Sequence, residues 1–150
     1  MKAPSRSRSG CPVSIALDIF GDRWSLLIVR DMMVRGYRSF QEFQTSGEGI
    51  ASNILASRLQ KLKAAGILAI EKDHADGRRI KYHLTKKGMD LAPVLLEMLL
   101  WAGRYEETEA PRAVINLMAS NRRRILDEVR RRWRNHDPRP LQVNGRWMLD

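Results

Sequence analysis

The apolar residues of this chain change their spacing at Gly66, and that change limits the fold more than any other feature of the sequence. Over residues 51–65 three leucines follow a helical repeat, which predicts an amphipathic helix with Gly66 just beyond its end. The leucines are Leu55, Leu59 and Leu62. After Gly66 the apolar residues alternate, which is typical of strands. A long helix is therefore expected to lead directly into a β-hairpin.

The predicted hairpin has strands at residues 67–72 and 79–84. Asp73–Gly77 lies between them as a turn, in which Asp76 and Gly77 are expected to supply positive-φ positions. The outer face and the turn carry many cations: Lys72, His74, Arg78, Arg79, Lys81 and His83. Such a ribbon suits contact with a phosphate backbone, and an ordinary solvated hairpin is the alternative.

A shorter helix is predicted to precede the long one. Ser39 and Glu42 have the spacing of a capping box, in which each side chain binds the other residue's backbone N–H. Gly47 and Gly49 mark a turn between the two helices. Two helices joined by a short glycine-containing turn form a helix-turn-helix, and a hairpin directly after it occupies the place of a wing.

Further helices are expected on both sides of this unit. The patterns predict helices at residues 12–20, 23–34, 86–105 and 113–133, with a kink or a late start at Pro93 in the third, and an irregular tail from Asn135. The fold class is mainly α with a small β-hairpin (α+β), a winged helix-turn-helix with extra helices at both ends. Residues 1–10 read as a flexible basic tail, 11–105 as the DNA-binding domain, and 106–150 as a helical extension and tail.

The charge and the cysteine content indicate what kind of partner the chain binds and in which compartment it works. The chain of 150 residues carries 27 Lys and Arg against 17 Asp and Glu, a net charge of +10 that suits a polyanion but does not choose between DNA, RNA and an anionic membrane. Cys11 is the only cysteine, which fits a reducing compartment. No signal peptide and no membrane span is evident, so the protein is expected to be soluble and cytoplasmic, without a membrane partner.

The outward face of the helix at 51–65 is small and polar near its start. It carries Ser52, Asn53, Ser57 and Gln60, with Arg58 and Lys61 on the flank. Such side chains can pair with base edges in the major groove, whereas an ordinary amphipathic helix with a solvated face is the simpler explanation of the helix taken alone.

An ordered series of residues from Cys11 to Tyr105 resembles the HxlR family of winged-helix regulators. The series is Cys11-Pro12, Ala16-Leu17-Asp18, Gly21-Asp22-Arg23-Trp24, Leu27-Ile28, Arg30-Asp31, Arg38-Ser39-Phe40-Gln41-Glu42-Phe43, Gly49-Ile50, Leu55, Arg58-Leu59, Leu62, Gly66-Ile67-Leu68, Tyr82, Leu84-Thr85-Lys86-Lys87-Gly88 and Trp101. The resemblance implies a homodimer that binds a pseudo-palindromic operator, with the first and the C-terminal helices building the dimer. It makes the helix that bears Ser52, Asn53, Ser57, Arg58 and Lys61 the recognition helix. It puts Arg38 and Ser39 where a phosphate contact is expected, and Arg78, Arg79 and Lys81 in the wing.

The chain departs from the family in three places. Gly21-Asp22-Arg23-Trp24 stands where Gly-Gly-Lys-Trp is usual, the wing lacks the usual proline-rich segment, and about forty-five residues follow Tyr105. That extension carries two arginine triplets, at 122–124 and 130–132. It could simply pack on the core, contact DNA or add dimer surface, and its apolar side favours dimer surface.

Cys11 is a candidate redox or electrophile sensor, because some family members use a cysteine there and a helix N-terminus lowers a thiol pKa. A passive residue near the dimer seam is the alternative.

Trp24 and Trp101 are expected in the core, although aromatic residues could also line a small-molecule effector pocket. The three histidines are expected on the surface. No catalytic, metal or cofactor motif is evident, so no enzyme activity is expected. The competing function is a winged-helix protein-interaction module without specific DNA binding.

Overall fold

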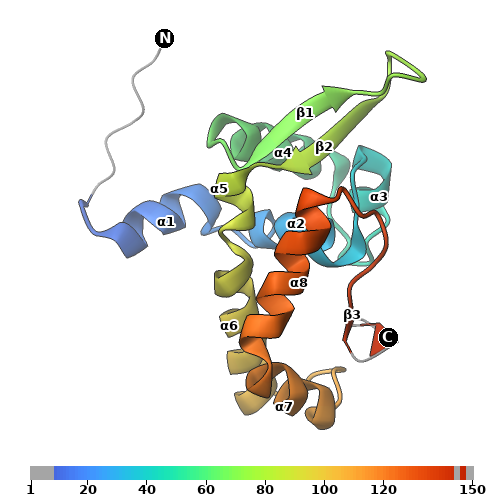
Figure 1. Cartoon of the computed structure of the whole chain (residues 1–150). Coiled ribbons are helices and arrows are strands. Elements are labelled where there is room, and N and C mark those ends of the chain that lie inside the picture. The colour runs from blue at the N-terminus through green and yellow to red at the C-terminus, as the bar shows by residue number, and fades with distance from the viewer. Residues whose placement is uncertain (1–8, 144–145, 148–150) are drawn as a thin grey trace.

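The computed structural model describes residues 9–143 and 146–147 (Figure 1). The elements that form the DNA-binding unit are α1 (Pro12–Phe20), α2 (Ser25–Arg30), the π-helix η1 (Asp31–Arg35), α3 (Phe40–Gln44), α4 (Ser52–Ala64), β1 (Leu68–Lys72), β2 (Ile80–Leu84), α5 (Lys86–Met89) and α6 (Ala92–Tyr105). The extension comprises α7 (Arg112–Ser120), α8 (Arg122–Arg134), β3 (Gln142–Val143) and β4 (Arg146–Trp147). The predicted class, a mainly helical winged helix-turn-helix, is confirmed.

The helix-turn-helix forms for the reasons that the sequence suggests. The Ser39 hydroxyl accepts a hydrogen bond from the backbone N–H of Glu42 at 3.3 Å, and the Glu42 carboxylate accepts one from the N–H of Ser39 at 2.9 Å. This capping box fixes the start of α3, which buries Phe43. Helix α4 buries the three leucines that predicted it, Leu55, Leu59 and Leu62. Its other side is left for solvent or a ligand.

Strands β1 and β2 pair in antiparallel register from Leu68 opposite Leu84 to Lys72 opposite Ile80. The turn differs from the prediction, because neither Asp76 nor Gly77 has a positive φ. The Asp73 N–H instead donates to the carbonyl of Arg79 at 3.0 Å, and the Asp73 and Asp76 side chains accept backbone hydrogen bonds two residues ahead. A seven-residue connection closed by aspartate side chains needs no left-handed residue at its tip.

Three predicted helices have different limits. The helix expected at 23–34 begins at Ser25, turns into η1 at Asp31 and stops at Gly36, whose φ is +74°. The helix expected at 86–105 starts again at Ala92, so the late start beside Pro93 is confirmed. The helix expected at 113–133 is two helices, because Asn121 adopts a non-helical conformation and its side-chain N–H donates to the carbonyl of Leu117 at 2.8 Å.

The extension packs against the DNA-binding unit. Helix α8 crosses in front of α6 and α2 in Figure 1, and it buries Ile125 and Val129. The indole N–H of Trp133 donates to the carbonyl of Leu84 at the end of β2, at 2.8 Å. The apolar side of α8 therefore faces its own chain, and the dimer surface expected from it is not supported.

The C-terminal tail, which was expected to be irregular, instead contains the β3–β4 hairpin. None of the described helices has the length and hydropathy of a membrane-spanning segment.

Candidate nucleic-acid interface

The outward face of α4 presents a polar strip beside the hairpin. Ser52, Asn53 and Ser57 are all exposed, opposite the buried leucines of the same helix. Helix α4 contacts β1, so its polar face and the wing belong to one connected unit. Small polar groups on a protruding helix can reach the base edges of a major groove, because no bulky side chain holds the helix away from the DNA. The three side chains that the sequence suggested for the outward face of this helix are therefore accessible.

The two cations on the flank of α4 are held by an acidic residue outside the helix. Asp22, between α1 and α2, places its carboxylate oxygens 3.1 Å from Nε of Arg58 and 3.9 Å from Nζ of Lys61. The same carboxylate accepts backbone hydrogen bonds from Trp24 and Ser25, each at 2.9 Å, and so caps α2.

The electrostatic state of Asp22 follows from these contacts. Partial burial opposes ionisation of the carboxyl, but hydrogen bonds from Ser25 and Trp24 and the charge of Arg58 outweigh it, so the pKa of Asp22 is lowered. The carboxylate is therefore charged when it faces Arg58. The sequence analysis did not predict that Asp22 pairs with Arg58 and Lys61. The one sign of it in the sequence was an aspartate at a position where the resemblance leads one to expect glycine.

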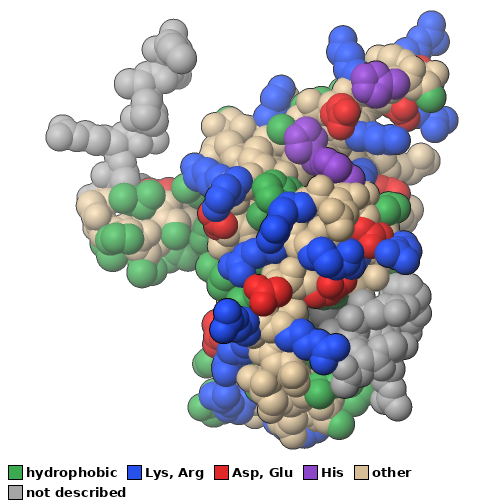
Figure 2. All heavy atoms as spheres, in the orientation of Figure 1, with side chains coloured by type: hydrophobic (Ala, Val, Ile, Leu, Met, Phe, Trp, Pro, Cys, Tyr) green, Lys and Arg blue, Asp and Glu red, His purple; other side chains and the backbone are tan. Residues whose placement is uncertain are grey.

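The wing projects from the body with its cations spread around the tip (Figure 2). Arg78, Arg79 and Lys81 are exposed. Nζ of Lys81 lies 3.4 Å from an Asp73 oxygen, and Nε of Arg79 lies 3.7 Å from an Asp76 oxygen. A backbone hydrogen bond from Ala75, and then the charge of Lys81, lower the pKa of Asp73. Ion pairs this exposed are weak, so both cations remain able to exchange their partner for a phosphate.

Arg38 and Ser39 lie where sequence reasoning expected a phosphate contact, but their side chains are used inside the protein. Nη1 of Arg38 donates to the carbonyls of Met32 and Tyr37, at 3.2 and 3.1 Å, and burial lowers the pKa of this guanidinium. The Ser39 hydroxyl caps α3. The structure therefore brings α4 and the wing together, while the Arg38 side chain bonds to the carbonyls of Met32 and Tyr37 inside the chain.

A second surface is apolar and exposed. Helix α1 projects from the body in Figure 1 and buries none of its residues. Its exposed apolar residues and those of α6 are Val13, Ile15, Leu17, Val94, Met98, Trp101 and Tyr105. We call this set the α1–α6 face. Trp101 is 60% exposed, so its predicted place in the core is wrong, whereas Trp24 packs against the core.

Cys11 directly precedes α1 and is exposed. Hydrogen bonds from the backbone N–H groups of Ser14 and Val13 lower the pKa of its thiol. Among the histidines, His74 and His136 are exposed as expected. His83 is half-buried, and its Nδ1 is buried with no hydrogen-bond partner among the described residues, so this histidine lies only partly at the surface.

A family model described as HxlR-like helix-turn-helix matches residues 19–110. The chain belongs to the HxlR family. The HTH-type transcriptional regulator YybR of Bacillus subtilis (strain 168) is 31% identical over 115 residues, which cover 77% of this chain and 86% of YybR. The solved structure of PA1607 is 39% identical, with a TM-score of 0.64 and coverage of 72% of this chain and 74% of PA1607. The redox regulator HypR in its oxidized form is 31% identical, with a TM-score of 0.58 and coverage of 65% and 100%.

This HxlR-family protein is thus a DNA-binding transcription regulator with a winged-helix fold. The matched residues 19–110 run from the end of α1 to the residue before Pro111. They include Asp22, α4 and the wing, and they leave Cys11, α7 and α8 outside. The extension therefore lies outside the residues that the family model matches.

Proposed function

We propose that this regulator binds a pseudo-palindromic operator as a homodimer and reads its sequence with α4. The observation that carries the proposal is the exposed strip of Ser52, Asn53 and Ser57 beside a cationic wing. Asn53 would pair with a base edge, and the two serines would serve as adaptable donors and acceptors. In a two-fold pair the two α4 helices would enter successive major grooves, about 34 Å apart.

The cations around this strip would hold the protein on the DNA backbone. Arg78, Arg79 and Lys81 at the wing would contact flanking phosphates, and each contact would release condensed counterions. Arg58 and Lys61 would lie at the edge of the groove, where Asp22 offsets part of their charge. Ser39 and Arg38 would act by shaping the start of α3, since their side chains bond within the chain.

The dimer would form through the α1–α6 face. Helix α1 has nine residues, none of them buried, and a helix of this length is marginal on its own in water. Covering its apolar side chains and those of α6 with the same face of a second copy would remove from water a surface that a lone monomer leaves exposed. Such a contact between identical faces has the two-fold symmetry that a pseudo-palindromic operator requires.

Cys11 would make the regulator responsive to oxidants or electrophiles. The thiol is exposed at a helix N-terminus with a lowered pKa, and thiolate is the reactive form. HypR, which shares the fold at 31% identity, is a redox regulator. Because Cys11 lies at the start of α1, modification there would act on the α1–α6 face and so on the spacing of the two α4 helices. A small-molecule effector bound at that face is a second route to the same element.

One experiment tests the central proposal. DNA fragments bound by the wild-type protein are selected from a random pool and compared with unselected DNA in mobility-shift titrations at low and physiological salt. We expect a two-fold symmetric consensus, bound at least about a thousandfold more tightly than random DNA. The mass of the complex, measured by light scattering, should correspond to two chains. Equal binding of all sequences at every salt concentration would instead support a protein-interaction module.

A further inference from the structure

The turn that leads into α4 has little local support. Ala51 precedes the helix and offers no side-chain cap to its first N–H groups. Gly47 and Gly49 have φ values of +87° and +73°, and a methyl group added to either would meet no atom of another segment within 4 Å. Ile50 is buried and anchors the end of the turn in the core. The path of the chain before Ile50, and with it the placement of Asn53, depends on contacts from other segments.

Two arginines from the preceding helices reach this turn. Nη1 of Arg30, the last residue of α2, donates to a carboxylate oxygen of Glu48 at 2.9 Å. Nη1 of Arg35, the last residue of η1, donates to the carbonyl of Ser46 at 2.8 Å. Among the described residues, the side-chain hydrogen bonds that other segments make to residues 46–49 come from these two arginines. The turn is therefore gripped at two points, one on its backbone and one on a side chain.

A buried carboxylate orients both arginines. Asp31 is only 2% exposed, and one of its oxygens accepts hydrogen bonds from Nε and Nη2 of Arg30 at 2.9 and 2.8 Å. Nη1 of Arg35 lies 3.3 Å from the same oxygen. A carboxylate this buried needs charged partners in good geometry, so it fixes the direction of both guanidinium groups. Asp31 begins and Arg35 ends the π-helix η1, a rare kind of helical turn that often occurs at functional sites.

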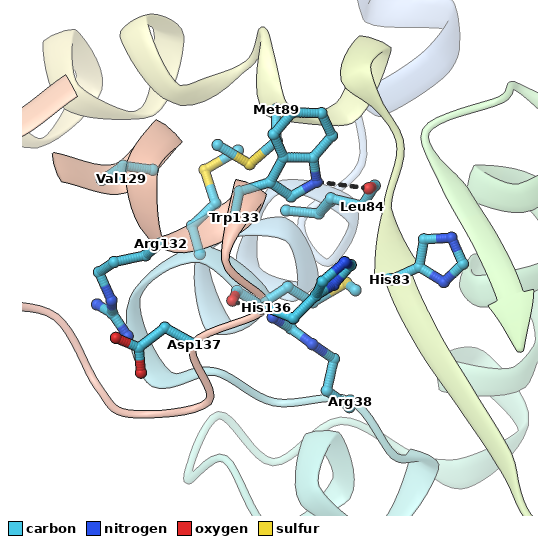
Figure 3. A pocket seen from close by; sticks show the side chains of 11 residues that line it. Arg38, His83, Leu84, Met89, Val129, Arg132, Trp133, His136 and Asp137 are labelled. Atoms are coloured by element: carbon cyan, nitrogen blue, oxygen red, sulfur yellow. Dashed lines mark hydrogen bonds between the residues drawn. The ribbon is translucent and has the colours of Figure 1, made fainter. Parts of the chain in front are cut away.

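Helix η1 is itself held by the C-terminal extension. Met32 of η1 lines the small cavity drawn in Figure 3, together with Val129 and Trp133 of α8. The N–H of Leu141, which is buried, donates to the carbonyl of Val34 at 2.6 Å. The two arginines therefore extend from a packed base toward a turn that has little packing of its own.

We propose that Arg30 and Arg35, oriented by Asp31, form a clamp that positions the start of α4 for reading bases. The inference rests on the proposed function, in which α4 reads the operator. Side chains that recognise a ligand must be held within about 0.5 Å of the productive geometry, and a helix start without a side-chain cap needs outside support for that. The three residues are positioning residues, because they act on α4 through the turn and need not touch the DNA.

The variant Glu48→Ala tests the clamp, because it removes the grip of Arg30 from a residue whose side chain is 29% exposed. We expect the ratio of operator to random-DNA affinity to fall by about fivefold to tenfold, as for a charge-assisted hydrogen bond that is discounted for partial exposure. Glu107→Ala makes the same charge change at an exposed position after α6 and should leave the ratio unaltered. If Glu48 were only a negative charge near the DNA, its loss would raise both affinities equally. An unaltered ratio in Glu48→Ala would overturn the proposal.

Hydrogen exchange without DNA gives a second, independent readout. The Leu55 N–H donates to the carbonyl of Ala51 in the first turn of α4 at 2.9 Å. Its exchange should be about tenfold faster in Glu48→Ala, whereas exchange at Leu62, near the end of the same helix, should stay as in the wild type. Unchanged exchange at Leu55, or equal acceleration at Leu55 and Leu62, would contradict a local positioning role. Wild-type protein that binds all sequences equally would overturn base reading by α4, while the exchange rates would still test the clamp.

The variant Arg30→Lys tests whether the two ends of the contact act together. Lysine keeps a positive charge beside Asp31 but lacks the fork that reaches Asp31 and Glu48 at once. We expect Arg30→Lys to lower the affinity ratio as Glu48→Ala does, and the double variant to be little worse than the more affected single one. Losses that add in full would show two separate effects and overturn the assignment. If Arg30→Lys does not fold, the ratio and the exchange rates of Glu48→Ala decide the question.

Discussion

The Asp22 carboxylate lies 3.1 Å from Nε of Arg58, and this contact ties the junction of α1 and α2 to helix α4. Because Asp22 also caps α2, the position of the Arg58 side chain depends on the helix that precedes it. A residue outside the helix-turn-helix therefore offsets part of the positive charge on the flank of α4. The glycine that the family usually has at this position could not do so.

The variant Asp22→Asn should bind all DNA sequences more tightly and with a stronger dependence on salt. The asparagine side chain keeps an oxygen for capping α2, while Arg58 and Lys61 lose the carboxylate that faces them. With one more cation available to phosphate, the slope of log K against log salt should steepen by about one unit. Asp18→Asn, an equal charge change on the exposed side of α1, is the control. Identical slopes for the two variants would show that Asp22 does not restrain the cations.

The cations of the wing should contribute to affinity without contributing to specificity. Arg78→Ala and Lys81→Ala should weaken binding to operator and random DNA alike, and each should flatten the salt slope by about one unit. Arg78 is the cleaner test, because Lys81 lies 3.4 Å from Asp73 and gives up that ion pair when it binds phosphate. Fluorescence anisotropy over a range of salt concentrations measures the slope. A slope equal to that of the wild type would remove the wing from the contact.

Asn53 should act on specificity. Truncation to alanine should lower the ratio of operator to random-DNA affinity by about tenfold to a hundredfold, because one bidentate base contact discriminates by about 1–3 kcal/mol. Competition between labelled operator and unlabelled random DNA gives the ratio directly. Asn116→Ala on α7 changes an exposed helical asparagine away from the interface and should leave the ratio unaltered. If Asn53→Ala also leaves it unaltered, Asn53 does not read bases.

The thiol of Cys11 should be more acidic in the folded protein than in the unfolded chain. Backbone N–H groups of Ser14 and Val13 stabilise the thiolate, so its pKa is lowered on folding. The rate of alkylation by iodoacetamide should therefore reach half its maximum at a lower pH in native protein than in urea. Cys11 is the only cysteine, so every label reports on it. Coincident pH profiles in the two states would contradict the role of the α1 N-terminus.

The sequence predicted those parts of the molecule that local patterns control. The leucine repeat of α4, the alternation of the wing and the capping box of Ser39 each act within a few residues, and each is found. The features it missed arise from contacts between distant segments. Arg38 turns inward to carbonyls of η1 and the following turn, Asp22 meets α4, and α8 covers the core. Trp101 was misplaced for a related reason, since an apolar stripe does not show whether its own chain or a partner covers it.

Whether a second copy covers the apolar stripe around Trp101 can be tested with a variant of that residue. Trp101 is 60% exposed in the monomer, so Trp101→Arg should leave the fold intact, yet a charge on the α1–α6 face would have to be buried without a partner on association. We expect the variant to sediment as a monomer at concentrations where the wild type is a dimer, and to lose operator binding because a single α4 contacts one half-site. Ile80→Arg changes an exposed apolar residue of the wing, which is 45% exposed and lies outside this face, and should remain dimeric. A dimer of unchanged stability in Trp101→Arg would place the two-fold contact elsewhere on the molecule.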